Sequence, residues 1–295
     1  MKSLFENPQT HVQTEQVKIV SDPGFVKWLD KEGTCIALTT YQAGKILFFG
    51  VNDKSELFLY NRNFERCMAL HVEGPDLYLS SLYQLIRFRD ALADTGGTTS
   101  DNFDCLYVPK VSWFTSDLDI HSIEKGEDGR PVFVNTLFSC ISEVSDKYSF
   151  QPLWQPPFIS KLAAEDRCHL NGMAMVDGKK KYVSMVAQTD LHEGWRDHRV
   201  DGGAVMDVTS GQIVCDGLSM PHNPFWHDDT LYLHQAGTGE FGKIDLDQGK
   251  FKPLVFLPGF LRGLSFVGLE YALAGTSLPR VNKTFSGLPI PLSIR

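Results

Sequence analysis

Short apolar runs separated by turn residues make up most of the chain. The runs are four to seven residues long and lie at 45–51, 56–60, 105–108, 131–137, 182–187, 230–234 and 270–274. Glycine-containing turn pairs separate them, as at Asp128-Gly129 and Asp177-Gly178. Such runs are typical of antiparallel strands. The pattern predicts an all-β fold, in which residues 80–94 are the best helix candidate and 77–82 could equally form a strand.

A longer repeat is superimposed on the strand pattern. Four segments share one layout, in which a small or polar start is followed by an apolar stretch, a turn and an aromatic-rich strand. They begin at His121, His169, His222 and Arg262, at intervals of 48, 53 and 40 residues. Two weaker copies precede them, near Met68 and before Lys45. These intervals suit four-stranded blades, so we expect a six-bladed or incomplete β-propeller, with two β-sandwich domains as the rival interpretation.

The end of the chain bears on the blade count. Only 19 residues follow Thr276, which is enough for one further strand but hardly for three. We expect a single domain over residues 1–295. In it, either the N-terminal segment completes the last blade, or the blade stays incomplete and a second subunit covers it.

Composition and charge limit the classes of partner. The chain is 42% hydrophobic and 22% charged, as folded globular proteins are. Its net charge is −8, from 28 basic and 36 acidic side chains, and no basic run occurs. Binding of nucleic acid or an anionic membrane requires such a basic surface. We therefore expect neither of these partners.

The N-terminus and the cysteines indicate the compartment. Residues 1–11 lack the apolar core of a signal peptide, and the longest apolar run, Ile46–Val51, is far shorter than the roughly 18 residues of a membrane-spanning helix. The six cysteines include no Cys-x-x-Cys pair. We expect a cytoplasmic protein with free thiols.

Two matches to known motifs fail on their context. Gly237–Gly242 has the glycine spacing of a dinucleotide fingerprint, but the residues that follow it alternate like a strand instead of opening a helix. His192-Glu193 begins like a zincin helix, but Arg196 stands where the second histidine is required. Neither motif therefore predicts a function.

Histidines recur at one position of the repeat. His121, His169 and His222 each stand at the entry to a proposed inner strand, and Arg262 takes that position in the fourth copy. Inner strands of a propeller surround one axis, so these side chains are expected to converge on it. Three imidazoles form a metal site with open coordination positions, suited to zinc, iron or copper. A histidine at a strand start is more often a hydrogen-bonded structural residue, and this interpretation stays open for each of the three.

Arg262 and one polar loop supply the other candidate groups. A guanidinium at the fourth position suits a carboxylate or phosphate on a small anionic or peptide substrate. The loop from Asp190 to Gly203 carries an unusual density of ionisable side chains. The catalytic acid–base candidates in it are His198, Asp197 and Glu193, and the substrate-binding candidates are Trp195 and Arg196. The loop is equally well explained as a solvated rim held together by salt bridges.

Several segments also resemble a known group of proteins. They are Trp195 to His198 with Asp201 to Gly203, Gly217 to His227, Gly237 to Gly239, and Leu257 to Leu264. Together they resemble a family of bacterial proteins known mainly as conserved hypothetical, over about the last two thirds of the chain. Met220-Pro221-His222 to His227 is the most specific part. The resemblance implies a propeller-like fold and no particular activity.

The histidine arrangement also resembles, as an analogy between folds, propeller lyases and oxygenases that hold zinc or iron with histidines from different blades. This favours a metal-dependent enzyme that works at the mouth of the propeller channel, by hydrolysis, elimination or oxidation. The alternative is a non-catalytic binding or scaffold propeller with structural histidines.

Overall fold

The structure is a computed structural model that describes residues 19–93, 95–99, 103–278 and 284–290. The chain divides into two compact units. The first comprises residues 1–37 and 48–60, and the second comprises residues 38–47 and 61–295. No helix among the described residues is long and apolar enough to cross a membrane.

The first unit contains helix α1 (Pro23–Glu32). The Asp22 side chain caps it by accepting a hydrogen bond from the Gly24 amide at 2.6 Å, and Gly33 ends it in a left-handed conformation with φ +56°. This helix was not predicted from the apolar pattern. Strands β1 (Ile36–Thr40), β2 (Lys45–Val51) and β3 (Leu57–Asn63) form a three-stranded sheet in that order and have residues in both units.

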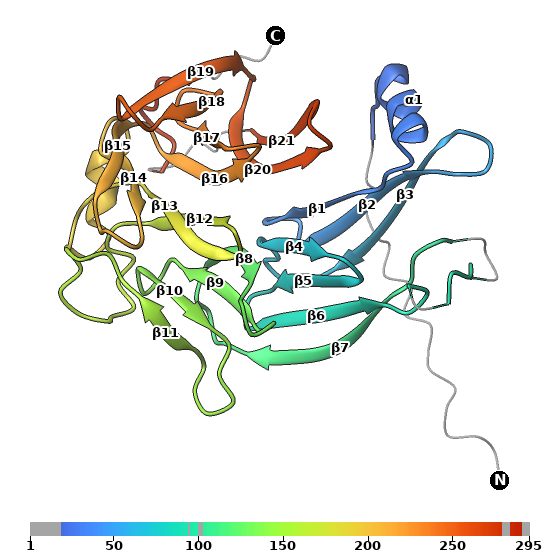
Figure 1. Cartoon of the computed structure of the whole chain (residues 1–295), viewed down its shortest axis with the longest axis horizontal. Helices are drawn as coiled ribbons and strands as arrows, with labels where there is room; N and C mark the ends of the chain where they lie inside the picture. Colours follow the sequence, from blue (N-terminus) through green and yellow to red (C-terminus); the bar gives the residue numbers. More distant parts are fainter. Residues whose placement is uncertain (1–18, 94, 100–102, 279–283, 291–295) are drawn as a thin grey trace. The chain divides into compact units, whose positions relative to one another are not determined.

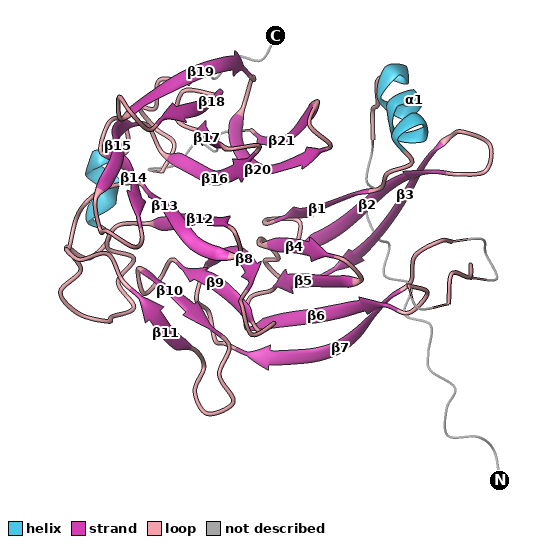
Figure 2. Ribbon diagram, in the orientation of Figure 1, coloured by secondary structure: helices cyan, strands magenta, loops and turns pink. Residues whose placement is uncertain are grey.

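The second unit is built from antiparallel sheets whose strands follow chain order (Figures 1 and 2). The first four-stranded sheet comprises β4 (Leu70–Glu73), β5 (Asp76–Ser80), β6 (Gln84–Asp90) and β7 (Tyr107–Phe114). The second comprises β8 (Ile120–Lys125), β9 (Pro131–Asn135), β10 (Cys140–Glu143) and β11 (Gln151–Trp154).

Two further four-stranded sheets and a hairpin complete this unit. The third sheet comprises β12 (Leu170–Val176), β13 (Lys179–Met185), β14 (Gly203–Asp207) and β15 (Ile213–Leu218). The fourth comprises β16 (Pro221–His227), β17 (Thr230–Gln235), β18 (Glu240–Asp245) and β19 (Lys250–Phe256). Strands β20 (Phe260–Val267) and β21 (Tyr271–Ser277) pair only with each other among the described residues.

The first strand of each sheet is its inner strand. Contacts join β4 to β8, β8 to β12, β12 to β16 and β16 to β20, so that these strands lie next to one another around a common axis (Figure 1). At one of these contacts a Cβ on Gly172 of β12 would meet Pro224 Cδ of β16 at 2.4 Å. Glycine therefore allows these two strands to approach closely. The all-β class and the β-propeller architecture are confirmed.

The predicted number of six blades is wrong. The described residues form five blades of three or four strands, followed by the two-stranded β20–β21 hairpin. The difference lies in the unit that begins near Arg262, because β20 and β21 pair only with each other among the described residues. The predicted contribution of the N-terminal segment to the last blade falls on residues 1–18, outside the described residues. The single domain over residues 1–295 stays a prediction.

The helix candidate at 80–94 is also wrong, because β5 and β6 occupy this segment. The register pairs Leu79 with Ile86 and Leu77 with Phe88, and Leu79 and Leu85 are completely buried. Apolar and basic residues alternate from Ile86 to Arg89, and this period of two is typical of a strand paired on both sides, not of a helix with one apolar face.

Candidate metal centre

Three histidines from successive blades converge. His121 lies on β8, His169 immediately precedes β12, and His222 lies on β16. One ring nitrogen from each lies within 4.8 Å of the others. The centroid of the His121 ring lies 5.0 Å from that of His169 and 6.4 Å from that of His222. The sequence prediction that these side chains meet is therefore correct, and a metal ion is the ligand that such a donor set fits.

A β-bulge interrupts each inner strand at the site. In β8, Ile120 pairs with Asn135 and Ser122 with Val134, which leaves His121 without a partner in the ladder. In β12 the corresponding extra residue is Asn171. The register of β16 shifts after His222, and the register of β20 shifts across Arg262 and Gly263. A bulge bends a strand and turns a side chain out of the regular alternation. The bulges displace His121 and Asn171 themselves, whereas His222 keeps its ladder partner His234 beside the irregularity.

Two of the histidines are held by the same local structure. The residues two positions earlier, Asp119 and Met220, have left-handed backbones with φ +52° and +45°. Their carbonyl oxygens lie 2.9 Å from Nδ1 of His121 and of His222, respectively. Because a carbonyl only accepts, each Nδ1 carries the proton and donates it. Nε2 of both rings is therefore the nitrogen that carries the lone pair.

His169 reaches the same state by a different route. Its own backbone is left-handed, with φ +48°, and its Nδ1 donates to the Asp166 carboxylate at 2.9 Å. The same carboxylate oxygen accepts from Trp195 Nε1 at 2.8 Å, and the indole lies against the His169 ring with centroids 4.3 Å apart. A carboxylate that accepts from the far nitrogen of a histidine fixes its tautomer and increases its basicity towards a metal.

Burial keeps two of the rings neutral. It lowers the pKa of His121 to about 4, although Asp119 opposes the shift. It also lowers the pKa of His222 well below the usual value, and the nearby Arg262 acts in the same direction. Metal binding requires neutral imidazoles. The protein therefore holds these ligands ready to bind a metal ion at neutral pH.

Arg262 occupies the site from the β20 side. Its Nη1 donates to Nε2 of His222 at 2.9 Å, and its guanidinium carbon lies 4.7 Å from the Phe260 ring centroid. In the bulge, the Gly263 carbonyl accepts a hydrogen bond from His234 Nε2 at 3.2 Å. The bulge thus has a fixed backbone, and Arg262 reaches the histidines as the repeat predicted.

Asn171 is a second donor to the same nitrogen. It is 1% exposed, and its Oδ1 accepts from Ser184 Oγ at 2.7 Å. Because Nδ1 of His222 carries the proton, Nε2 is an acceptor, and the amide atom 3.5 Å from it is assigned as Nδ2. Two N–H donors therefore point at the lone pair of His222.

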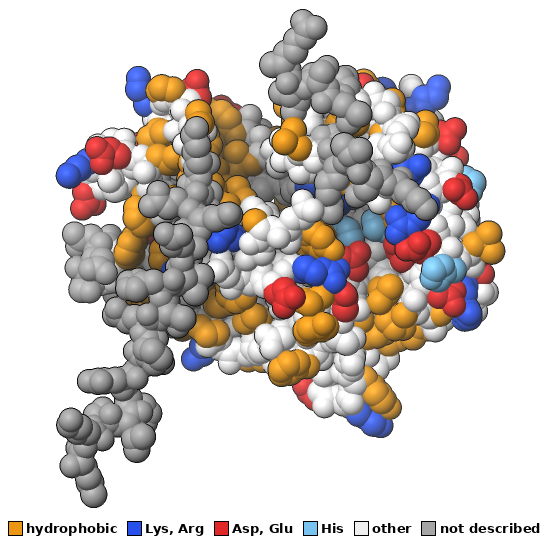
Figure 3. All heavy atoms as spheres, turned by 180° about the vertical axis from the view of Figure 1, so that it is seen from behind, with side chains coloured by type: hydrophobic (Ala, Val, Ile, Leu, Met, Phe, Trp, Pro, Cys, Tyr) orange, Lys and Arg blue, Asp and Glu red, His pale blue; other side chains and the backbone are white. Residues whose placement is uncertain are grey.

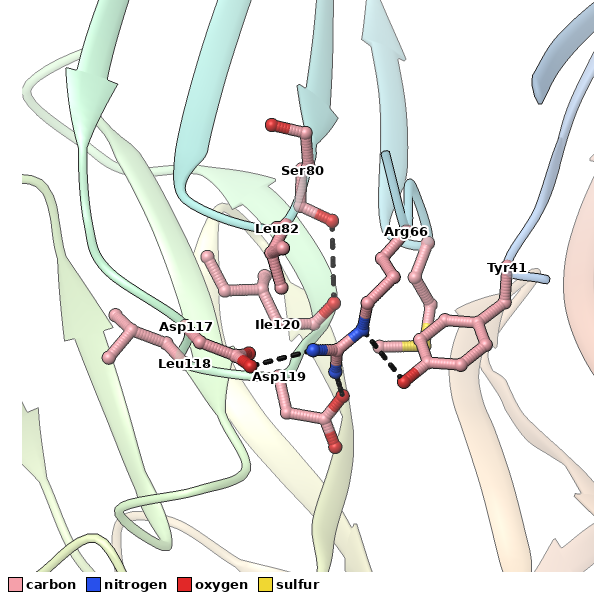
Figure 4. A pocket seen from close by; sticks show the side chains of 10 residues that line it. Tyr41, Arg66, Ser80, Leu82, Asp117, Leu118, Asp119 and Ile120 are labelled. Atoms are coloured by element: carbon pink, nitrogen blue, oxygen red, sulfur yellow. Dashed lines mark hydrogen bonds and ion pairs between the residues drawn. The ribbon is translucent and has the colours of Figure 1, made fainter. Parts of the chain in front are cut away.

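A second layer of contacts supports His121. Thr136 Oγ1 lies 2.8 Å from its Nδ1 and donates to the Leu170 carbonyl at 2.6 Å, which ties β8 to β12. Behind Asp119, Arg66 donates to Asp117 at 2.6 Å and lies 3.7 Å from the Asp119 carboxylate (Figure 4). These side chains line a cavity of about 10 Å³. The network holds the turn before β8 in place.

The loop candidates differ in their positions. Residues Gly194–His198 form a short 3₁₀ helix, η1. Trp195 is buried against His169, and Arg196 stacks on the indole at 4.4 Å while pairing with Glu193 at 2.6 Å. Asp197 and His198 are exposed, and the described contacts of the three histidines include neither side chain. The structure brings Trp195 to the site through His169, and the catalytic and substrate-binding roles of the loop residues stay predictions.

Three contributing residues were missed in the sequence. Asp166 lies three residues before His169 in a segment without regular structure, and that spacing was the available signal. Asn171 is the second residue of its inner strand, as His121 and His222 are of theirs. The repeat would have indicated it if the strand had been predicted to begin at Leu170. Thr136 follows β9 and has no distinguishing pattern.

The family comparison gives one match. The model of the family described as "Domain of unknown function (DUF4915)" matches residues 23–294. This match confirms the resemblance to a conserved hypothetical family. Among curated proteins, no sequence matches the chain.

Several solved structures are similar at low identity. Virginiamycin B lyase from Staphylococcus aureus is 13% identical, with 83% of this chain and 74% of that chain covered and a TM-score of 0.45. A streptogramin B lyase is 12% identical, with 83% and 88% covered and a TM-score of 0.47. A protein from Lactobacillus plantarum is 12% identical, with 75% and 67% covered and a TM-score of 0.43. Likenesses of this size say nothing about the chemistry of the three histidines.

Proposed function

We propose that this chain, which belongs to the DUF4915 family of domains of unknown function, holds one divalent transition-metal ion at His121, His169 and His222 and acts as a metal-dependent enzyme on a small anionic substrate. One observation carries the proposal. All three Nδ1 atoms contact an oxygen acceptor, which leaves the Nε2 lone pairs for a metal, and one ring nitrogen of each histidine lies within 4.8 Å of the others.

The donor set fits such an ion. Three neutral nitrogen ligands suit zinc, iron or copper, whereas magnesium and calcium prefer oxygen ligands. Each ligand has its own acceptor, which is a backbone carbonyl for two of them (Asp119 and Met220) and the Asp166 carboxylate for the third. Support of this kind from outside the ligand shell is what metal-binding histidines require.

A metal bound by three imidazoles would retain open positions, at which it polarises a substrate oxygen or lowers the pKa of a bound water to about 7. Arg262 supplies a permanent positive charge beside it, suited to a substrate carboxylate or phosphate. Hydrolysis, elimination and oxidation all use such a centre, and the ligand set is equally suited to each. His198, Asp197 and Glu193 are the proposed acid–base groups, with Trp195 and Arg196 lining the approach.

A non-catalytic binding propeller is the second candidate. The hydrogen bond from Arg262 to His222 Nε2 favours it, because this contact satisfies the histidine without a metal. Under this alternative the three rings are structural, and the protein binds no ion.

Metal content separates the two candidates. The protein is stripped with a chelator, incubated in turn with Zn²⁺, Fe²⁺ and Cu²⁺, desalted and analysed by mass spectrometry for bound metal. We expect about one ion per chain, and loss of that ion in His169→Ala and in His222→Ala. The control is His192→Ala, which removes an exposed histidine of the nearby loop and keeps the ion. Circular dichroism checks that each variant is folded.

Two outcomes contradict the proposal. One is no retained metal after reconstitution of the wild-type protein. The other is stoichiometric metal in both histidine variants, which would place the ion elsewhere.

Catalysis needs its own test. Small carboxylates and peptides are assayed with metal-loaded and metal-free protein and with the variants Arg262→Ala and His198→Ala. Each proposed role predicts at least a tenfold loss of kcat/KM, equivalent to about 1.4 kcal/mol of transition-state stabilisation. Activity that both variants retain would remove Arg262 and His198 from the mechanism.

A further inference from the structure

His222 Nε2 has two uses that exclude each other. It is the nitrogen that a metal ion at this site requires, because Nδ1 donates to the Met220 carbonyl. It is also the acceptor for Arg262 Nη1 at 2.9 Å. One lone pair serves either a metal or an N–H donor. Binding of the metal therefore breaks the hydrogen bond from Arg262.

Both donors on that nitrogen lose their acceptor at once. Asn171 Nδ2 also points at His222 Nε2, and Asn171 is held in place by the hydrogen bond from Ser184. Asn171 is almost completely buried. A buried N–H group without an acceptor is costly, and so is a guanidinium next to a divalent cation. A negatively charged group that accepts from Asn171 and offsets the two neighbouring positive charges therefore stabilises the metal-bound state.

We infer that a small oxyanion, such as a carboxylate, and the metal ion bind to this site together, with Arg262 exchanging His222 for the anion. This inference rests on the proposed metal centre. The oxyanion accepts from Arg262 and Asn171 and also offsets the charge of the ion. Without the anion, Arg262 competes with the metal for His222.

The surroundings of Arg262 suit this exchange. Its guanidinium rests on the Phe260 ring, and the backbone at Gly263 is held by His234. The backbone thus remains fixed while the long side chain changes its partner. On the face shown in Figure 3, histidine side chains lie beside basic and acidic side chains at the surface. Of the groups at the site, His121 and Arg262 are partly exposed, whereas His169 and His222 are buried.

Reciprocity makes the inference measurable. If the anion raises the affinity for the metal by some factor, the metal raises the affinity for the anion by the same factor. The affinity for Zn²⁺ is measured by competition with a chromophoric chelator in an oxyanion-free buffer, with and without formate, a carboxylate that binds zinc only weakly on its own. For the wild-type protein we expect formate to tighten zinc binding at least tenfold.

The decisive variant is Arg262→Gln, which removes the competing cation. We expect it to bind zinc at least tenfold more tightly than the wild type without formate, and to respond less than twofold to formate. Arg130→Gln is the matched control, because it removes a guanidinium from the turn between β8 and β9, where it pairs with Asp146. It should keep the wild-type response.

The outcomes distinguish this inference from the metal centre itself. Equal zinc affinity in the wild type and Arg262→Gln, with no response to formate in either, overturns the exchange and leaves the metal centre standing. Absence of zinc binding in every protein overturns both. If Arg262→Gln does not fold, the wild-type measurement with and without formate decides alone.

Discussion

A histidine is the second residue of two neighbouring inner strands, His71 in β4 and His121 in β8, yet only His121 belongs to the candidate metal centre. His71 lies in a regular ladder opposite Tyr78. Its ring nitrogens lie 3.3 Å from Glu124 and 3.9 Å from Glu73. His121 is the extra residue of a bulge, and its ring meets His169 and His222. The same residue type at the same position therefore has two fates.

The backbone accounts for the difference. In a regular strand the side-chain direction alternates, and the neighbouring pairs fix which face a histidine takes. One extra residue changes that direction for the bulged position. Asp119 contributes by adopting a left-handed conformation before β8, which places its carbonyl against the His121 ring. No residue of β4 or of the two positions before it has a positive φ.

The largest expected effect tests this contrast directly. His121→Ala should lower the affinity for the metal about 1,000-fold, or about 4 kcal/mol, because ions held by four ligands bind with roughly 10–16 kcal/mol and one of three protein ligands is lost. His71→Ala should change it less than twofold. Chelator competition measures both. Similar losses in the two variants would mean that the bulge does not separate the roles of these histidines.

Acid stability is expected to respond next most strongly. In the metal-free protein burial lowers the pKa values of His121 and His234 to about 4. The folded state then holds fewer protons than the unfolded state between about pH 6.5 and 4, so stability is complete above this window and falls as the pH decreases through it. Each group contributes up to about 3 kcal/mol. Urea unfolding at several pH values in this window should show that the free energy of unfolding of His234→Gln changes less steeply with pH than that of the wild type.

Glu124, a residue of β8 that contacts His71 of β4, should make an opposite contribution. Burial raises the pKa of Glu124 to about 8, and Glu73 adds to the shift. The folded state keeps this proton while the unfolded state loses it, so Glu124 lowers stability progressively as the pH rises from about 4.5 to 8. In the same experiments, the free energy of unfolding of Glu124→Gln should increase relative to that of the wild type as the pH rises across that range. A constant difference between the two proteins would contradict the assignment.

The smallest of these effects concerns the support of the ligands. Asp166→Asn replaces the carboxylate that accepts from His169 Nδ1, and we expect a 10- to 100-fold loss of metal affinity. Asp117→Asn is the comparison variant, because Asp117 is one layer further out and contacts Arg66. We expect a change below threefold. Equal losses of metal affinity in the two variants would contradict the expectation that a residue's contribution falls with its distance from the ligands.

The sequence predicts which residues form the site better than it predicts how the backbone positions them. The spacing of the repeat predicted that His121, His169, His222 and Arg262 would meet, because equivalent positions of successive blades face one axis. It placed His169 in register with the other two, whereas the structure puts Asn171 at that strand position and brings His169 in from the preceding turn. Bulges and left-handed residues depend on the pairing between strands, which a single-sequence pattern does not contain.

The fold was predicted to a similar depth. Short runs and turn pairs were sufficient for the all-β class and the propeller. The blade count failed at the ends, where β20–β21 has two strands, and the apolar spacing of residues 80–94 was compatible with two structures until the neighbouring strands selected one. Helix α1 was overlooked, although Asp22, Pro23 and Gly33 are the capping residues expected at its two ends.

The wide spacing of the ligands along the chain has a consequence for biosynthesis. His121 and His222 are 101 positions apart in the sequence, and each lies on a different sheet. A ribosome-bound chain that ends before β16 offers only two of the three imidazoles, and contacts between such distant residues form late and slowly. The full set of ligands for the proposed ion is therefore available only after β16 has been synthesised. Metal occupancy would then report that the blades carrying the site have assembled.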